Sequence, residues 1–233
     1  MPCTLPASLA DAAVCRGSFH AVLGREAGEA VFADFSAALQ KAQADGRILT
    51  ASLFRYENHL FFYAEGLNRP FTPQGLCPAL DAALLPWPPA LGEAAPRPWA
   101  AMQPYFYHDV PTTAADWQQG RCPQRRRGRI ALLPPDSWCS YMEHHLRIVT
   151  EGLVEGDRWH LICVQEGVLF SYLEEPRTNV NIKHRPGAHS PELDAWIAAD
   201  PESHFARFTP EQKAHPDSGH NFVFLLRIAG TED

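Results

Sequence analysis

The sequence predicts an α+β protein built from two ferredoxin-like β-α-β-β-α-β repeats. The first observation is a duplicated hairpin, since Arg47–Glu65 and Asp157–Glu174 each carry two apolar runs, a polar turn and a closing Phe-x-Tyr-x-Glu. The second is an aromatic-rich helical segment before each hairpin. The third is that a sheet covered by helices on one side would leave strands this apolar bare on the other. We therefore expect the repeats to pack sheet to sheet as a pseudo-dimeric α+β barrel.

The first repeat is predicted over residues 17–111. Apolar residues recur at helical spacing after a short strand-like run, and two β-prone runs then flank a polar turn. Its expected elements are a strand at Ser18–Leu23, a helix at Glu26–Ala44, a hairpin of Ile48–Phe54 with Leu60–Glu65, a short helix within Cys77–Leu85 and a strand at Tyr105–Val110.

The second repeat is predicted over residues 129–230, after a connection at 112–128. That connection has little apolar periodicity and ends in Gln-Arg-Arg-Arg-Gly, which we interpret as a solvated surface turn. The expected elements are a strand at Arg129–Leu133, a helix at Asp136–Glu151 capped by Asp136 or Ser137, a hairpin of Arg158–Val164 with Val168–Glu174, broken helix within Pro191–Phe208 and a strand at Asn221–Ile228.

Composition narrows the function classes. The 233 residues are 45% hydrophobic with a formal net charge of −7, which favours a globular protein and gives no electrostatic reason to bind nucleic acid or an anionic membrane. Six cysteines lie singly, without the spacing of a disulfide framework or zinc site, and are expected to be reduced thiols. With neither a leader-like segment nor an apolar stretch that could span a bilayer, we expect a cytoplasmic protein.

The candidate site lies in the second repeat, where the predicted helix carries Tyr141 and His145. Residues four apart share a helix face, so a phenol and an imidazole point at one place, whereas His144 lies off that face. Such a pair suits acid-base chemistry, although it also occurs as the polar edge of a packed helix. On the second hairpin, alternation places Phe170, Tyr172 and Glu174 on one side, which we expect to face a polar cavity.

These residues resemble the L-rhamnose mutarotase family of dimeric α+β barrel proteins, through Arg129-Ile-Ala, Pro134-Pro135, Tyr141-x3-His145-x2-Ile148 and the second hairpin. The resemblance spans most of the second repeat. It implies that Tyr141 binds sugar and that His145 donates the proton in anomer interconversion. A substrate-contacting tyrosine of the family falls on Trp159, and its tandem tryptophans fall on His204 and Phe205. The family has one repeat per chain, whereas this chain has two.

The function expected is therefore anomer interconversion of a small monosaccharide. His145 would act as the acid, Tyr141 and Glu174 would orient or exchange protons, and Trp159 would form an apolar wall. The chemistry requires no metal or other cofactor, and His184 and His189, which lie near Lys183 and Pro186, are expected to be surface histidines.

Several alternatives remain open at this point. The first is a non-catalytic module that holds a small ligand with Trp159, Phe170 and Tyr172. Another is a haem protein ligated through His144, His145 or His160, and a further one is a cofactor-free monooxygenase, which rests on fold alone. The partner in the leading interpretation is a sugar-like small molecule, and the chain would be a monomer with an internal pseudo-dimer or a homodimer.

Overall fold

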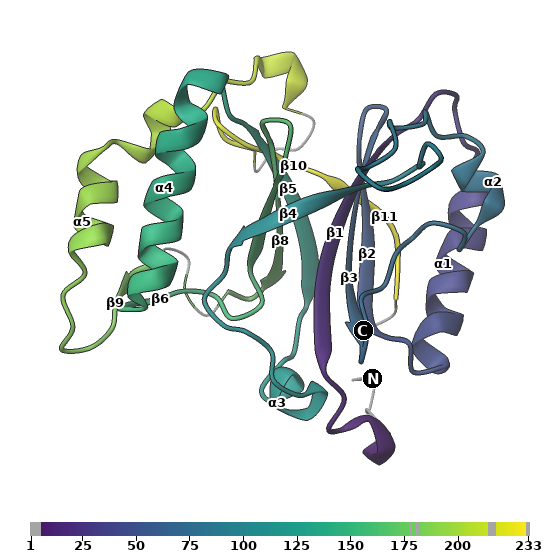
Figure 1. Cartoon of the computed structure of the whole chain (residues 1–233), viewed down its shortest axis with the longest axis horizontal. Coiled ribbons are helices and arrows are strands. Elements are labelled where there is room, and N and C mark those ends of the chain that lie inside the picture. The colour runs from purple at the N-terminus through teal and green to yellow at the C-terminus, as the bar shows by residue number, and fades with distance from the viewer. Residues whose placement is uncertain (1–5, 178, 180–181, 214–217, 232–233) are drawn as a thin grey trace. The chain divides into compact units, whose positions relative to one another are not determined.

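The computed structural model describes residues 6–177, 179, 182–213 and 218–231. The chain divides into two compact units. The described residues of unit 1 are 6–102, 111–122 and 226–231, and those of unit 2 are 103–110, 123–177, 179, 182–213 and 218–225. Each unit combines helices with an antiparallel sheet, which confirms the α+β class (Figure 1).

Unit 1 contains an antiparallel sheet in the order β4-β1-β3-β2-β11. Its strands are β1 (Val14–Val22), β2 (Ile48–Tyr56), β3 (His59–Leu67), β4 (Ala100–Phe106) and β11 (Leu226–Gly230). Its helices are α1 (Glu29–Ala44), α2 (Pro78–Asp81), α3 (Ala114–Gln118) and the 3-10 turn η1 (Ala7–Leu9). The final strand of the first repeat was expected at Tyr105–Val110, but β4 begins five residues earlier because Ala100–Met102 pair with β1.

The core of unit 1 lies between its sheet and α1, which covers one face of that sheet in Figure 1. Phe32, Phe35 and Leu39 are buried on one side of α1, as the helical spacing predicted, and pack with Leu53 and Phe62 of the β2-β3 hairpin. Burial of this apolar face stabilises the helix, since most of the stability of a helix in a protein comes from tertiary packing.

Unit 2 contains a second antiparallel sheet, in the order β10-β5-β8-β7-β4. In β4, residues 103–106 pair with β7. The other strands are β5 (Arg125–Leu132), β7 (Leu161–Gln165), β8 (Val168–Glu175) and β10 (Val223–Phe224), with a separate pair of β6 (Val154–Glu155) and β9 (Lys183–His184). The helices are α4 (Pro135–Glu151), α5 (Pro191–Ala198), η2 (Pro201–His204) and η3 (Pro210–Gln212).

Local chemistry explains how the elements of unit 2 begin and turn. The N-cap residue of α4 is Pro134, and no side chain forms a capping hydrogen bond there. The prediction that Asp136 or Ser137 caps this helix was therefore wrong. At the hairpin turn, Glu166 and Gly167 have φ of 50° and 77°, the left-handed pair that a tight two-residue turn requires. The last predicted strand is divided between β10 in unit 2 and β11 in unit 1.

The arginine run was wrongly interpreted as a solvated turn. Strand β5 starts at Arg125, and the side chains of Arg126 and Arg127 are buried rather than exposed. The reason is their ion pairs on the neighbouring strand, Arg126 with Glu174 and Arg127 with Glu175. Because carboxylates on β8 pair with these arginines, charged side chains can be buried in β5. Apolar periodicity alone does not predict such a strand.

The Phe-x-Tyr-x-Glu repeat encodes the same buried hydrogen bond in both units. The hydroxyl of Tyr63 donates to Glu65 at 2.7 Å, and that of Tyr172 donates to Glu174 at 2.6 Å. In unit 1 the fully buried Glu65 also accepts two hydrogen bonds from Arg121, at 2.7 and 2.9 Å. The Arg121 guanidinium opposes the effect of burial and holds the pKa of the Glu65 carboxyl below its usual range.

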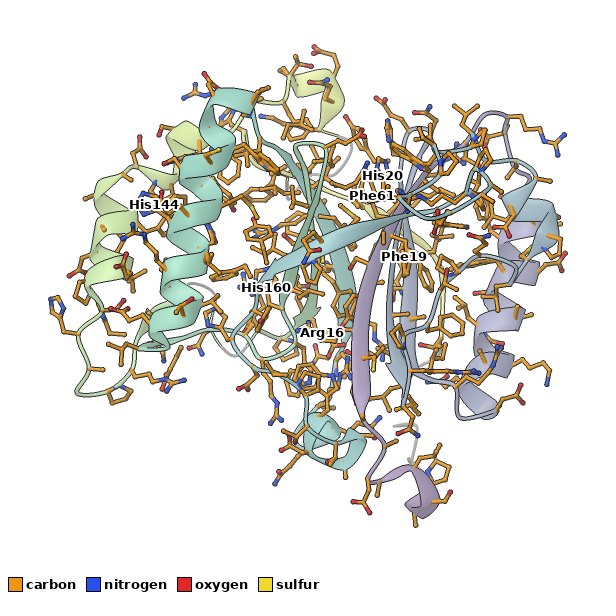
Figure 2. All side chains as sticks on the ribbon, in the orientation of Figure 1. Arg16, Phe19, His20, Phe61, His144 and His160 are labelled. Carbon is orange, nitrogen blue, oxygen red and sulfur yellow. The ribbon has the colours of Figure 1, made fainter. Side chains whose placement is uncertain are left out.

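Arg16 extends this cluster from the first strand. Its Nε donates to the Tyr63 hydroxyl at 2.9 Å, and its guanidinium lies 5.1 Å from the centre of the Trp117 ring. Figure 2 labels Arg16 on β1. Residues 111–122 follow β4 in sequence and are held in unit 1 by these contacts. Among the described helices, none combines the length and apolar character that crossing a bilayer requires.

Candidate functional site

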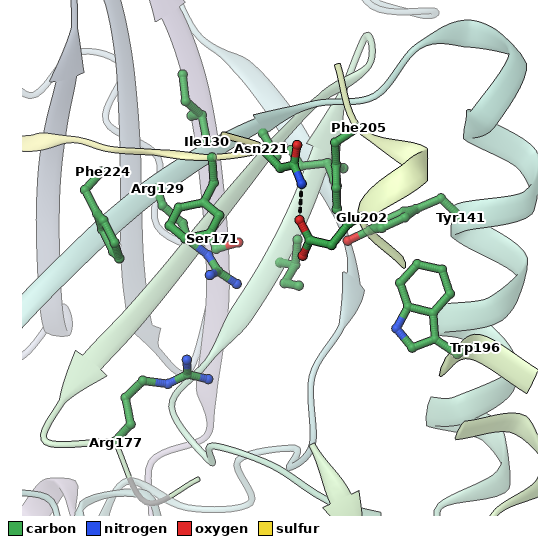
Figure 3. A pocket seen from close by; sticks show the side chains of 14 residues that line it. Arg129, Ile130, Tyr141, Ser171, Arg177, Trp196, Glu202, Phe205, Asn221 and Phe224 are labelled. Atoms are coloured by element: carbon green, nitrogen blue, oxygen red, sulfur yellow. Dashed lines mark hydrogen bonds between the residues drawn. The ribbon is translucent and has the colours of Figure 1, made fainter. Parts of the chain in front are cut away.

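Unit 2 contains a cavity of about 460 Å³ between its sheet and its helices. Arg129 and Ile130 on β5, Leu169 and Ser171 on β8, and Tyr141 on α4 line it (Figure 3). Further lining residues come from other segments of the unit: Ala131, Ile162, Arg177, Trp196, Glu202, Phe205, Asn221, Phe222 and Phe224.

Strand alternation determines which side chains of β8 reach this cavity. Leu169 belongs to the core that α4 and α5 cover, so its face of the strand points at the helices. Ser171 shares that face. Phe170, Tyr172 and Glu174 therefore lie on the opposite face, where they are buried, and do not line this cavity as predicted.

Tyr141 and His145 do lie together, one turn apart on α4. Their ring centres are 4.1 Å apart, and Trp196 of α5 packs edge-on against both rings, at 5.4 and 4.7 Å. Tyr141 reaches the cavity, whereas His145 is not among the residues that line it. His144, labelled in Figure 2, is half-buried, and its ring lies 5.4 Å from that of Trp196. As the next residue along α4 from His145, it projects about 100° away around the helix.

His145 is poorly suited to donate a proton. Its Nδ1 lies 2.9 Å from the backbone carbonyl of Tyr141, and because a carbonyl only accepts, Nδ1 carries the hydrogen. Burial among Phe106, Tyr105 and Trp196 lowers the pKa of His145 to about 4. The ring is therefore neutral near pH 7, with its one N–H engaged by the backbone.

Tyr141, in contrast to His145, is suited to donate a hydrogen bond. Burial raises the pKa of its phenol to about 12, so the hydroxyl keeps its hydrogen at neutral pH. Figure 3 shows that hydroxyl pointing toward Glu202. Tyr141 can thus donate a hydrogen bond to a bound molecule.

The remaining predicted residues are divided between the cavity and its surroundings. Phe205 lines the cavity and packs edge-on against Tyr141 at 5.2 Å. His204 is buried behind it, with Nε2 3.2 Å from the hydroxyl of Ser140. Trp159 is half-buried in the turn before β7, which starts at Leu161 rather than at the predicted 158, and does not line the cavity.

Four residues that sequence reasoning missed define the polar character of the cavity: Arg129, Arg177, Glu202 and Asn221. They come from separate segments, so no motif or spacing connects them. Arg129 was placed in the correct strand, and an arginine alternating with apolar residues in a buried strand was the one available signal. In the described part of the chain, no three His, Cys, Asp or Glu side chains gather closely enough to hold a metal ion.

No family model matches the chain, and no curated protein matches it. Among solved structures, a protein described as a "putative monooxygenase" from Fusobacterium nucleatum has a TM-score of 0.40 and 9% identity over 94% of each chain. One with the same description from Lactobacillus acidophilus has a TM-score of 0.39 and 7% identity, over 93% of this chain and 95% of that chain. An anthrone oxidase-like protein has a TM-score of 0.35 and 7% identity over 92% of each. Similarity at this level assigns no function.

These findings correct the resemblance to L-rhamnose mutarotase, and with it the expected isomerase activity on a carbohydrate. Two of the structures named above are described as a "putative monooxygenase" and the third as an anthrone oxidase-like protein, and no family model or curated protein connects the chain to a mutarotase. The geometry agrees, because His145 is neutral and donates to the backbone, and the face of β8 that carries Tyr172 and Glu174 points away from the cavity. The shared motif reflects a buried structural hydrogen bond.

Proposed function

We propose that unit 2 binds a small planar aromatic compound in its cavity. The observation that carries this proposal is the lining itself. A volume of about 460 Å³ falls within the usual range for small-molecule sites, and the walls include Trp196, Phe205, Phe222 and Phe224. Flat apolar rings bind between such walls with favourable stacking and dispersion energy.

A binding experiment tests this proposal. Naphthalene derivatives should quench or shift the tryptophan fluorescence, because Trp196 lines the cavity. Ser171→Leu should abolish binding by filling space beside the β8 wall, whereas the matched variant Ser171→Ala leaves that space open and should bind as wild type does. Circular dichroism would show that both variants fold. Equal binding to both would mean that the ligand sits elsewhere.

Oxygenation of the bound aromatic without a cofactor is the candidate reaction. It is favoured by Glu202, a carboxylate at one end of a cavity that has five aromatic side chains in its lining and also holds the cationic Arg129. Glu202 can accept the proton of a bound phenol, and the electron-rich anion that remains reacts at a ring carbon with O₂. One oxygen atom then becomes the second carbonyl of a quinone, and the other leaves as water with the two hydrogens that the phenol loses. Asn221 donates a hydrogen bond to Glu202 Oε2 and so positions that carboxylate.

Oxygen consumption tests the reaction apart from binding. With 1-naphthol and related phenols, Glu202→Gln should lower the rate of O₂ uptake by roughly 10²–10⁴-fold, the usual contribution of a positioned base, with little effect on binding of the neutral phenol. If none of these phenols consumes O₂ faster with wild type than with buffer, the site is a binding site without this chemistry.

We also propose that the chain consists of two ferredoxin-like repeats. The orders β4-β1-β3-β2 and β10-β5-β8-β7 support two ferredoxin-like repeats, corresponding to the predicted spans 17–111 and 129–230 on either side of 112–128. Packing of the repeats sheet to sheet as a pseudo-dimer, a monomeric or homodimeric state and a cytoplasmic location stay predictions. Small-angle scattering and sizing of the purified chain would test the first two.

A further inference from the structure

The polar groups of the cavity in unit 2 are separated by charge. Figure 3 shows the guanidinium groups of Arg129 and Arg177 on one side, and the Glu202 carboxylate with the Asn221 amide and the Tyr141 hydroxyl on the other. Aromatic side chains line the space around them. A ligand that spans the cavity therefore meets a cationic end and a hydrogen-bonding end, which we call the arginine end and the Glu202 end.

At the arginine end, Arg129 is the cation that forms no close ion pair among the described residues; Glu202 acts on it only at longer range. Arg177 forms an ion pair with Asp157, whereas Arg129 makes no ion pair with any acidic residue among those the structure describes. Its guanidinium lies 5.1 Å from the centre of the Phe222 ring. Burial, and then the nearby Arg177, lower the pKa of Arg129. A cation in such a place without a close counter-ion is stabilised by an anion, and guanidinium geometry matches a carboxylate.

The Glu202 end favours a neutral hydroxyl group of the ligand over an anion. The Asn221 amide donates through Nδ2 to Glu202, which defines its orientation because a carboxylate only accepts. Asn221 is 8% exposed, and no described residue donates to its Oδ1. Carboxylate and amide oxygens that accept, beside a phenol that can donate, suit a ligand hydroxyl. A second anion would be repelled by Glu202.

We infer that the cavity is specific for a hydroxylated aromatic carboxylate, with the carboxylate at Arg129 and the hydroxyl at Glu202 and Asn221. This inference rests on the proposed aromatic-binding function and adds the substrate class. Arg129 is the residue that determines specificity for the anion, and Glu202 is the residue that excludes a second one.

Four naphthalene probes test both ends by titration calorimetry at pH 7: 6-hydroxy-2-naphthoate, 2-naphthoate, 2-naphthol and naphthalene-2,6-dicarboxylate. The hydroxynaphthoate should bind at least about tenfold more tightly than each of the others, because each of them leaves one end of the cavity unsatisfied or repelled. Arg129→Gln should remove the advantage of the hydroxynaphthoate over 2-naphthol, and Arg129→Lys should restore part of it. The matched control is Arg125→Gln, which alters an exposed arginine on the same strand and should change nothing.

At the Glu202 end, Glu202→Gln should reduce the difference in binding affinity between the dicarboxylate and the hydroxynaphthoate. The possible failures are distinguishable. If none of the four probes binds wild type, the proposed aromatic site itself is wrong. If the probes bind but 2-naphthol equals the hydroxynaphthoate, or Arg129→Gln weakens both equally, the aromatic site stands and the inferred substrate class is overturned. The comparison of the four probes on wild type separates these outcomes even if a variant fails to fold.

Discussion

Acidification should destabilise the fold through His145. The folded-state pKa of this ring is about 4 against an ordinary value of 6.5, and the largest cause is burial. Between these two values the unfolded chain binds a proton that the folded chain excludes. The contribution of His145 to stability is therefore fully present above pH 6.5 and is lost as the pH falls toward 4.

The size of this effect follows from the two pKa values. At about 1.4 kcal/mol for each pH unit, the gap between 6.5 and about 4 corresponds to about 3 kcal/mol of unfolding free energy. About 2 kcal/mol of this should be lost between pH 7 and pH 5. Such a loss is a large fraction of the roughly 5–15 kcal/mol by which folded domains are commonly stable.

Urea unfolding monitored by circular dichroism at pH 7, 6, 5 and 4 measures the effect. His145→Gln removes the titrating group, so the difference in stability between wild type and variant should shrink by about 3 kcal/mol across this range. His59, whose pKa burial also lowers and which is not among the groups that act on His145, remains in both proteins and cancels. His189→Gln, at a ring that is 75% exposed, is the control. A stability difference that is constant with pH would refute the argument.

Three further predictions concern the buried polar network and the strands. Glu65→Gln should lower the free energy of unfolding by about 3–5 kcal/mol, because it leaves the Arg121 guanidinium buried without its carboxylate; a loss below about 1 kcal/mol in urea would contradict this. Tyr172→Phe deletes one buried hydrogen bond and should cost about 1–3 kcal/mol in the same assay, with no change in ligand binding since the ring lies outside the cavity. Gly66→Ala places a Cβ 2.2 Å from a backbone carbonyl oxygen and should reduce the melting temperature strongly, whereas Gly17→Ala meets ordinary contacts and should not.

The order of elements could be predicted well because local patterns encode it. Apolar residues at helical spacing in α1, and β-prone runs around polar turns in both hairpins, identify element type without tertiary information. Boundaries were less accurate where pairing decides them. Strand β4 starts at Ala100 because its first residues pair with β1, and nothing in that local sequence indicates the pairing.

The sequence by itself determined the repeated Phe-x-Tyr-x-Glu motif, the α+β class and the shared face of Tyr141 and His145, since these depend on patterns along single segments. Tertiary structure decided which face of β8 packs against the helices. Both faces of this strand are buried, so alternation along the sequence does not distinguish the face toward the helices from the other. It also buried Arg126 through a carboxylate on the next strand, and brought Arg129 and Glu202, 73 positions apart in sequence, to the same cavity. Ion pairs and cavities form between segments that are distant in sequence, so local sequence patterns do not predict them.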